Sequence, residues 1–449
     1  MSLLDQIFEA GVVGCGGAGF PTHAKLSAKV DYLLLNGAEC EPLLRTDRYL
    51  MRHRADEIVA AAVKVKAQVS APSCVIALKK SYTQEIAALE GAIARQSAPI
   101  TLHTMESFYP AGDEQVIVCE VTGRVVPPAG IPLDVGCVVS NVATMSAIYD
   151  AMQGTAFTQK YLTVTGAVAS PAMVLAPVGT PLADCIALAG GADCGDYMVI
   201  SGGPMMGRPM TMEQLKGETV TKTTSGLIVL PMESHGAMQH QISIEHMLNR
   251  ARSACIQCSF CTQLCPRHLL GHPLEPHKIM RKLAMATDLE QILEDEDVRR
   301  AQLCCECGIC ELYACPMQLQ PRRVNSMLKK KLAEKGVRYP KGEGVLTPDA
   351  ERDNRKSPTQ RVAARAGASP WYHTEIDELK TAKPMRVSLS LRQNIGAPSQ
   401  PVVKAGDRVS VGQLIAKCPE GKLGAQLHAS IDGRVTEVTD KIEIEGDAI

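Results

Sequence analysis

The sequence contains no long hydrophobic run. No stretch of the 449-residue chain approaches the roughly 18 consecutive apolar residues that a membrane-spanning helix needs. The N-terminus also lacks the basic segment and apolar core that are typical of a secretory signal. We therefore expect a chain without a membrane span that stays in the cytoplasm.

An excess of charge of either sign is also missing. The 47 basic and 48 acidic residues leave a net charge of −1. Such a balance gives no reason to expect binding to nucleic acid or to an anionic membrane surface. The expected partners are small molecules or proteins.

Cysteine, in contrast, is abundant. Nine of the 17 cysteines lie between Cys255 and Cys315. Disulfide frameworks are typical of small secreted domains, and this is a large chain without a signal, so metal ligation is the better interpretation. The first run has the C-x2-C-x2-C-x3-C-P spacing of bacterial ferredoxins; it consists of Cys255, Cys258, Cys261, Cys265 and Pro266.

A second run repeats the C-x2-C-x2-C spacing, although its last cysteine before Pro316 comes one residue late. In two-cluster ferredoxins the fourth cysteine of each run binds the cluster of the other run. We therefore predict two 4Fe-4S clusters with crossed ligands. One is assigned to Cys255, Cys258, Cys261 and Cys315, and the other to Cys304, Cys307, Cys310 and Cys265.

Two alternatives remain for this region. Cys305 is the spare cysteine, but it could replace its neighbour Cys304 as a ligand. A pair of zinc sites is disfavoured, because zinc usually takes two separated C-x2-C pairs rather than triplets closed by Cys-Pro. Between the runs, residues 273–303 carry apolar residues at steps of three and four, which predicts helix.

A glycine-rich loop lies near the N-terminus. Residues 11–25 read GVVGCGGAGFPTHAK, with Gly14, Gly16, Gly17 and Gly19 in one loop. Glycines let backbone amides approach a phosphate or a flavin closely. A plain surface turn is the alternative interpretation.

Two carboxylates follow a predicted buried strand. Residues 32–42 read YLLLNGAECEP, and Glu39 and Glu41 are two residues apart. The period of a strand would aim both side chains the same way. Like charges on one buried face are costly unless they meet water, a cation or a ligand, and a nicotinamide ribose is such a ligand.

The first 155 residues alternate strand-like and helix-like segments, which predicts an α/β domain with a flavin at its strand ends. Strands are expected at residues 33–35, 75–78 and 116–119, and helices at 55–65 and 82–92. The amphipathic leader at residues 3–8 is interpreted as a first helix packed beside the glycine loop. The alternative is a packaging signal for a protein shell.

Four ordered segments resemble the FMN and NADH segments of a known family, which contains the flavin-binding subunit of respiratory NADH dehydrogenase and the C subunit of the Rnf complex. They are Gly16–Thr22 with Lys25, then Asn36 with Glu39 and Glu41, then Gly112, Asp113 and Glu114, then Asn141 to Thr144.

This resemblance implies roles for these residues. The glycine loop and Lys25 would cradle FMN, Asn36 and Asn141 would hydrogen-bond it, and the segments 112–114 and 141–144 would complete the cofactor site. Glu39 and Glu41 would line the nicotinamide side as the catalytic residues. Ala38 stands where the respiratory subunit has an aspartate, so one polar flavin contact of that family is in question.

The rest of the chain resembles further domains of the same family. Residues 158–207 are similar to the β-grasp SLBB domain, interpreted as a scaffold, with a corrinoid site as the alternative. Hairpin turns within residues 385–437 resemble a barrel-sandwich domain of lipoyl type, although the flanks of Lys422 fit lipoylation poorly. The expected domains span residues 1–155, 156–240, 241–335 and 381–449, with a linker at 336–380 that Trp371 and Tyr372 would pin.

The barrel-sandwich segment stands at the C-terminal end, whereas the Rnf C subunit has it at the N-terminal end. In this the chain resembles the cobalamin reductases of propanediol-utilisation microcompartments. The resemblance implies NADH-dependent reduction of cob(III)alamin through cob(II)alamin toward cob(I)alamin, with FMN and two 4Fe-4S clusters. It also implies a corrinoid adenosyltransferase and shell proteins as partners, inside a bacterial microcompartment. The alternative function is a soluble NADH-entry subunit of an Rnf-like complex.

Overall fold

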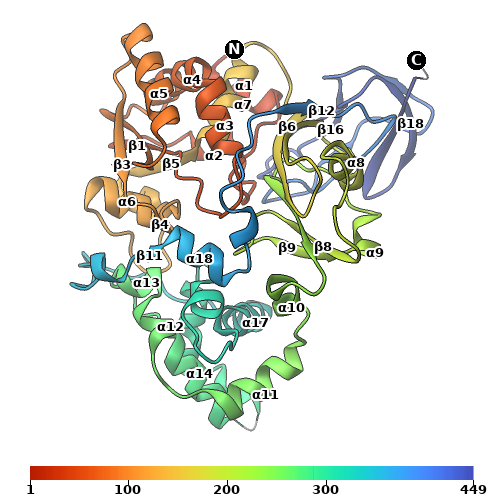
Figure 1. The fold of residues 1–449 in the computed structure, drawn as a ribbon. Coiled ribbons are helices and arrows are strands. Elements are labelled where there is room, and N and C mark those ends of the chain that lie inside the picture. The colour runs from red at the N-terminus through yellow and green to blue at the C-terminus, as the bar shows by residue number, and fades with distance from the viewer. Residues whose placement is uncertain (287, 448–449) are drawn as a thin grey trace.

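The computed structural model describes residues 1–286 and 288–447. Figure 1 shows an N-terminal α/β domain beside a β-sheet domain, a helical domain below both, and a C-terminal β domain on the far side of the β-sheet domain. This arrangement confirms the expected multidomain α/β fold class. The last two residues of the expected C-terminal domain lie outside the described residues.

The N-terminal domain is built on a parallel sheet with the strand order β3-β2-β1-β5. Strand β1 (Tyr32–Asn36), one of the two inner strands, carries three fully buried leucines, Leu33, Leu34 and Leu35, because both faces of the sheet are covered. Residues of α4, α5 and α7 pack on one face, and residues of α6 pack on the other. The strands are β1 (Tyr32–Asn36), β2 (Ser73–Lys79), β3 (Thr101–Met105) and β5 (Cys137–Asn141). The helices are α1 (Leu3–Glu9), α2 (Thr22–Lys25), α3 (Thr46–His53), α4 (Ala55–Gln68), α5 (Thr83–Gln96), α6 (Glu114–Thr122), the short η1 (Pro132–Val135) and α7 (Val142–Met152).

The strand predicted at residues 116–119 is wrong, because these residues belong to α6. A short apolar run reads the same in a buried strand and in a buried helix. The capping residues decide between them: the Asp113 side chain accepts hydrogen bonds from the backbone N–H groups of Gln115 and Val116, and Gly123 ends the helix at φ +71°.

The leader forms α1 and packs against the N-terminal domain. Ile7 is fully buried, Leu3 and Leu4 are partly buried in the same core, and the Phe8 ring meets the His23 ring edge-on at 4.8 Å. The leader is therefore a first helix beside the glycine loop, as interpreted.

The second domain is a six-stranded sheet in the order β12-β7-β6-β10-β8-β9. Leu182, Cys185 and Ile186 of α8 bury the apolar side of this helix against the sheet. Its elements are β6 (Gln159–Gly166), β7 (Ala172–Pro177), α8 (Leu182–Leu188), β8 (Tyr197–Ser201), β9 (Arg208–Thr211), α9 (Met212–Leu215), β10 (Gly226–Pro231) and β12 (Leu379–Thr381).

The helical domain carries the cysteine runs. The stretch at residues 273–303, predicted as helical, is divided into short helices, because the side chains of Asp288 and Asp295 cap new helices at α15 and α16. The helices are α10 (His235–His240), α11 (Ile244–Ala254), α12 (Phe260–Gln263), α13 (Pro266–Leu269), α14 (Pro276–Met285), α15 (Leu289–Ile292), α16 (Glu296–Arg299), η2 (Arg300–Leu303), the π-helical turn η3 (Ile309–Tyr313) and α17 (Pro321–Glu334).

The segment at residues 336–380 forms strand pairs with two neighbouring domains. Its strand β11 (Ser357–Pro358) pairs with β4 (Phe108–Tyr109) of the N-terminal domain, and β12 extends the sheet of the second domain. Trp371 and Tyr372 pack against a core that includes Leu43 and Met198. The remaining elements are η4 (Asp353–Arg355), α18 (Thr359–Arg365) and η5 (Ser369–Trp371); Figure 1 shows α18 between the N-terminal and helical domains.

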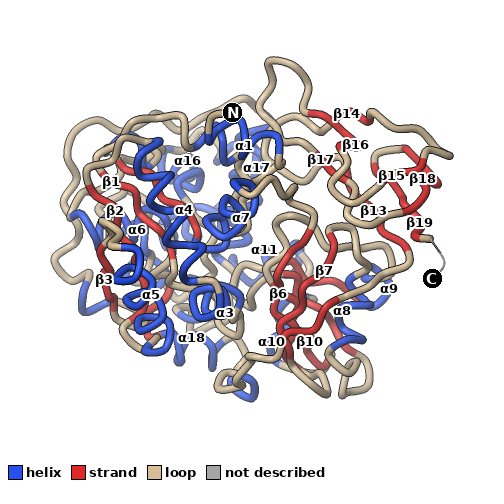
Figure 2. Tube along the Cα trace, turned by 90° about the horizontal axis from the view of Figure 1, so that it is seen from above, coloured by secondary structure: helices blue, strands red, loops and turns tan. Residues whose placement is uncertain are grey.

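The C-terminal domain consists of two small sheets, in the orders β13-β19-β18-β15 and β14-β16-β17. Val387, Leu389, Ile415, Ile442 and Ile444 form its core. Figure 2 shows this domain as strands and loops at one side of the molecule. The strands are β13 (Arg386–Ser390), β14 (Gln400–Pro401), β15 (Arg408–Val409), β16 (Leu414–Lys417), β17 (Leu427–His428), β18 (Gly433–Val438) and β19 (Lys441–Gly446).

Candidate functional site

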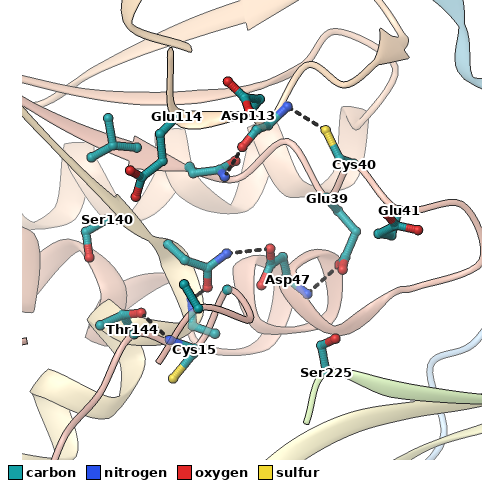
Figure 3. A pocket seen from close by; sticks show the side chains of 18 of the residues that line it. Cys15, Glu39, Cys40, Glu41, Asp47, Asp113, Glu114, Ser140, Thr144 and Ser225 are labelled. Atoms are coloured by element: carbon teal, nitrogen blue, oxygen red, sulfur yellow. Dashed lines mark hydrogen bonds between the residues drawn. The ribbon is translucent and has the colours of Figure 1, made fainter. Parts of the chain in front are cut away.

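A cavity of about 410 Å³ opens at the carboxyl ends of β1 and β5. Ligands bind at this edge of a parallel sheet in many α/β folds. Figure 3 shows side chains from several segments converging on the cavity, which we call the flavin pocket. Its lining includes Gly14, Gly16, Gly19, Lys25, Asn36, Glu39, Glu41, Gly112, Asp113, Glu114, Asn141 and Thr144.

The glycine loop forms one wall of the flavin pocket. The N–H of Gly14 donates to the carbonyl of Phe20 at 2.9 Å, which closes the loop. Gly17 and Gly19 have φ values of +109° and +66°, in the region that favours glycine. Gly17 does not line the cavity, and a Cβ on it would meet no atom within 4 Å. The predicted close approach of backbone to cofactor is therefore expected at Gly14, Gly16 and Gly19, which line the cavity, and not at Gly17.

Lys25 and Glu114 meet across the mouth of the pocket, with 2.6 Å between Nζ and Oε1. Asn36 donates through Nδ2 to the carbonyl of Gly112 at 2.9 Å. These two contacts join segments that are more than 70 positions apart in the chain. Side chains that the sequence analysis assigned to one site therefore do lie together.

Asp113 is held by an arginine of the helical domain. The guanidinium of Arg267 in α13 makes two hydrogen bonds to the Asp113 carboxylate, at 2.7 and 3.0 Å. Although burial alone would raise the pKa of Asp113, the Arg267 guanidinium and two backbone N–H groups lower it. Asp113 therefore stays ionised, and it joins α6 to the helical domain.

Asn141 caps α7, because its Oδ1 accepts from the backbone N–H of Ala143 at 2.8 Å. Its Nδ2 donates to Asp47 Oδ2 at 2.7 Å. Thr144, one turn into α7, accepts from the backbone N–H of Cys15 at 3.0 Å. The start of α7 thus holds the glycine loop in place.

Glu39 does not follow the strand alternation that the sequence analysis assumed. β1 ends at Asn36, and Glu39 has φ +35°. Its carboxylate turns to the start of α3, where Oε2 accepts from the backbone N–H groups of Asp47 at 2.5 Å and Arg48 at 3.2 Å. Burial and the nearby Asp47 carboxyl raise the pKa of Glu39 to about 8.

Glu41 points a different way, toward Tyr109 of the N-terminal domain and Met205 of the second domain. Its Oε1 lies 3.1 Å from the Tyr109 hydroxyl, and Oε2 accepts from the backbone N–H of Met205 at 2.9 Å. Burial raises the pKa of Glu41 to about 7. The two glutamates share the flavin pocket, but different hydrogen bonds orient them, and the assumption of a common direction is wrong.

Several lining residues were missed by the sequence analysis. Asp47, Tyr109, Lys160 and Cys305 line the pocket, and Arg267 stands behind Asp113. No local pattern marks them, since their neighbours in space are far away in the chain. Asp47 is the residue that sequence reasoning could most easily have found, because it stands at the start of a helix directly after the Glu39–Glu41 segment.

The crossed cysteine groups come together in two cavities of the helical domain. The first cavity is lined by Cys255, Cys258, Cys261 and Cys315. The second cavity is lined by Cys265, Cys304, Cys307 and Cys310, with Cys305 as a fifth thiol. Each cavity thus takes three cysteines from one run and the last cysteine of the other.

The arrangement of the thiols suits a cubane rather than a single ion. Within residues 1–286 and 288–447, no three His, Cys, Asp or Glu side chains approach closely enough to share one metal ion. Zinc draws all four ligands to about 2.0–2.3 Å from one centre, whereas each thiolate of a cubane binds a different iron. Four predicted ligand thiols at each cavity, with Cys305 as a fifth thiol at the second, fit a 4Fe-4S cluster.

The flavin pocket also fits its expected cofactor. Gly16 lies against Asn141, and a Cβ added to it would stand at an ordinary contact distance, 3.5 Å, from the asparagine side chain. Backbone amides, asparagine side chains and hydroxyls surround the cavity, and such groups match the polar edges of a flavin.

Among the described residues, no helix has the length and apolar composition needed to cross a membrane.

Comparison with protein families assigns a description to each part of the chain. Residues 7–150 match the Nuo51 FMN-binding domain, and residues 161–209 match the SLBB domain. Residues 254–320 match a 4Fe-4S dicluster domain, and residues 371–448 match the RnfC barrel sandwich hybrid domain. With the geometry above, these matches define an electron-transferring oxidoreductase with flavin and iron–sulfur domains.

Relatives of known name narrow this class. The chain is 42% identical to the cobalamin reductase PduS of Citrobacter freundii, over 98% of this chain and 95% of that protein. It is 43% identical to the PduS of Salmonella typhimurium, over 97% and 94%. The C subunit of the Na⁺-translocating ferredoxin:NAD⁺ oxidoreductase complex of Acetobacterium woodii is 36% identical, over 59% of this chain and 57% of that protein. The chain belongs to the family of the cobalamin reductase PduS, which confirms the resemblance.

Proposed function

We propose that this protein is an NADH-dependent cobalamin reductase. It would reduce cob(III)alamin through cob(II)alamin toward cob(I)alamin and supply a corrinoid adenosyltransferase in 1,2-propanediol degradation. The proposal rests on family membership, which extends over nearly the whole length of the PduS proteins. The same relationship is our reason to propose a location in a bacterial microcompartment, with shell proteins as neighbours.

One observation carries the proposal: the flavin pocket adjoins the second cysteine cavity. Cys305 and Cys307 line both. The Tyr109 hydroxyl lies 2.7 Å from the carbonyl of Cys307 and 3.1 Å from Glu41 Oε1, so a single side chain touches both sites. Such contact is what an electron-transferring chain requires between a two-electron and a one-electron carrier.

When bound, FMN would accept one hydride, with its two electrons, from a nicotinamide and would release the electrons singly, as one-electron clusters require. We assign the glycine loop, Lys25, Asn36, Asn141 and the segments 112–114 and 141–144 to FMN binding. Glu39 and Glu41 would orient the nicotinamide, and the two crossed cysteine groups would hold two clusters. The donor is assigned as NADH because of the family resemblance.

The first cysteine cavity is the better candidate for the exit of electrons. None of its cysteines lines the flavin pocket. The side chain of Ile256, which lines this cavity, is 61% exposed. Three of the four cysteines of this cavity, Cys255, Cys258 and Cys261, are partly exposed, whereas Cys265, Cys307 and Cys310 of the second cavity are buried. We therefore propose that a corrinoid approaches the first cavity.

The test is turnover by the purified protein alone. With NADH and hydroxocobalamin, anaerobic protein should reduce the corrinoid without further proteins. A Cys258→Ser variant should still oxidise NADH with ferricyanide, which can accept electrons from the flavin, but should no longer reduce cobalamin. If the isolated protein reduces ferricyanide but needs a larger complex for any other acceptor, the alternative of an Rnf-like entry subunit is correct instead.

The role of the glutamates has a separate readout. Replacing both Glu39 and Glu41 with Gln should raise the apparent KM for NADH or slow flavin reduction in stopped-flow absorbance. Reoxidation of the chemically reduced variant by cobalamin should be unchanged. A variant slowed only in reoxidation would contradict this assignment, because it would show that the carboxylates act in cobalamin reduction and not in NADH oxidation.

A further inference from the structure

Lys160 reaches the flavin pocket from the second domain. It stands on β6, is only 3% exposed, and lines the pocket together with Cys15, Ala143 and Thr144. Since the sequence analysis assigned every flavin contact to residues 14–144, Lys160 had no expected role. It is a charged side chain brought to the cofactor site by a different domain.

The hydrogen bonding of Lys160 is incomplete. Its Nζ has three donors, and the structure gives it one long hydrogen bond, 3.5 Å to the carbonyl of Cys15. A buried ammonium group is costly unless it is paired. Lys25, the other cation of the pocket, is already paired with Glu114 at 2.6 Å. Of the two lysines that line the pocket, Lys160 is therefore the one whose ammonium group can still donate hydrogen bonds to a ligand.

The carboxyl groups that line the pocket outnumber its two lysines. Glu39, Glu41, Asp47, Asp113 and Glu114 line it. A phosphomonoester dianion could not enter such a site without a cation to receive it. The Asp47 carboxyl lies near Lys160, but no hydrogen bond joins the two side chains, and Asp47 accepts from Asn141 instead.

Lys160 lies among groups that suit the phosphate end of FMN. Cys305, Cys307 and Tyr109 mark the end of the pocket that adjoins the second cysteine cavity, where the redox-active ring has to lie. The glycine loop and the start of the 11-residue helix α7 line the pocket beside Lys160. The first backbone N–H groups of a helix have no partner within the helix and attract phosphate. In α7 the N–H of Ala143 already donates to the Asn141 side chain, so Lys160 is the more important group for a phosphate here.

We propose that Lys160 binds the phosphate group of FMN, so that the SLBB domain supplies a ligand to the flavin of the neighbouring domain. This inference rests on the proposed binding of FMN in the flavin pocket. It predicts that Lys160 discriminates FMN from riboflavin, which has the same ring and ribityl chain but no phosphate. It also makes flavin retention depend on the docking of β6 against the N-terminal domain.

The test measures affinities of flavin-depleted, cluster-loaded protein for FMN and for riboflavin, by quenching of flavin fluorescence. Lys160→Met should weaken FMN binding by about tenfold to a hundredfold, as for the loss of a hydrogen bond to a charged group. Riboflavin affinity should change much less. Lys160→Arg should restore most of the FMN affinity, and Lys64→Met, which removes an exposed lysine outside the pocket, should change neither.

Unchanged iron content and melting temperature identify folded variants; if Lys160→Met fails this check, Lys160→Gln and Lys160→Arg are compared instead. An equal loss of FMN and riboflavin affinity by a folded variant would overturn the assignment and leave Lys160 as a counter-ion of Asp47. If the unsubstituted protein bound neither flavin, the proposed function itself would fail. The two failures are thus distinguishable.

Discussion

Glu41 is a carboxyl group whose surroundings suit its protonated form. A protonated Glu41 could donate to the Tyr109 oxygen and accept from Met205 N–H, while Tyr109 donates to the carbonyl of Cys307. The ionised form offers only acceptors and is partly removed from water, so burial raises its pKa to about 7. Tyr109 can give its one proton to only one acceptor at a time, which ties the charge of Glu41 to the contact with Cys307.

Glu41→Gln should therefore stabilise the protein in a pH-dependent way. The folded-state pKa is raised, so between about pH 4.5 and 7 the unfolded chain loses the proton first, and the stability of the native protein falls as pH rises. Glutamine reproduces the hydrogen bonds of the protonated acid but cannot ionise. At about 1.4 kcal/mol per pKa unit, the gain at pH 8 reaches at most about 3 kcal/mol, less what water in the pocket screens.

Melting temperatures of the two proteins at pH 5 and pH 8 provide the measurement. The variant should exceed the unsubstituted protein at pH 8 and match it closely at pH 5. Glu114→Gln, which removes a half-exposed carboxylate of the same pocket, is the matched control and should show no gain at pH 8. An equal shift of Glu41→Gln at both pH values would contradict the assigned ionisation.

At the scale of elements, short helices distribute the cysteines between the two cavities. Cys265 directly precedes α13, and Cys315 follows the turn η3. Arg267, two residues after Cys265, binds Asp113 at the start of α6. The same short helix thus places a thiol at the second cavity and fixes the helical domain to the flavin pocket.

This placement predicts which cluster each cysteine substitution damages. Cys265→Ser should remove the same electron paramagnetic resonance signal as Cys307→Ser, and Cys315→Ser the same signal as Cys258→Ser. Each fourth cysteine thus affects the cluster of the other run. Cys305→Ser should leave both signals, because the other four thiols complete the second cavity. If Cys265→Ser instead removed the signal that Cys258→Ser removes, the crossed assignment would be wrong.

Across the whole molecule, contacts between domains assemble the electron path. The flavin pocket takes its lining from the N-terminal domain, from β6 of the second domain, and from Cys305 and Cys307 of the helical domain. Lys222 of the second domain is 1% exposed and donates to the carbonyls of Gly11 and Gln426, both at 2.7 Å. It thereby connects the second domain to the N-terminal and C-terminal domains.

Complete protein should therefore carry its full set of cofactors together. Anaerobically purified protein should contain about eight irons and eight acid-labile sulfides per chain, two cubanes of four each, and one FMN released by acid precipitation. Iron, sulfide and flavin assays check this. Four irons per chain would refute the second cluster, and flavin that stays with the precipitate would refute non-covalent binding.

The sequence by itself determined the cysteine groups and the segments that form the flavin pocket. Cluster loops are recognisable because the ligands lie within a few residues of one another, so spacing along the chain reflects spacing around the metal. The glycine loop is likewise local, because its conformation needs positive φ at Gly17 and Gly19. The family resemblance placed Asn36, Glu114 and Asn141 together, as the structure also does.

Only the tertiary structure decided how these parts meet. Glu39 and Glu41 diverge because β1 ends before them and because their partners, Asp47 and Tyr109, come from other segments. Lys160 reaches the glycine loop from 145 positions away. Hydrogen bonds and ion pairs across such separations depend on domain packing, which leaves no regular spacing in the sequence.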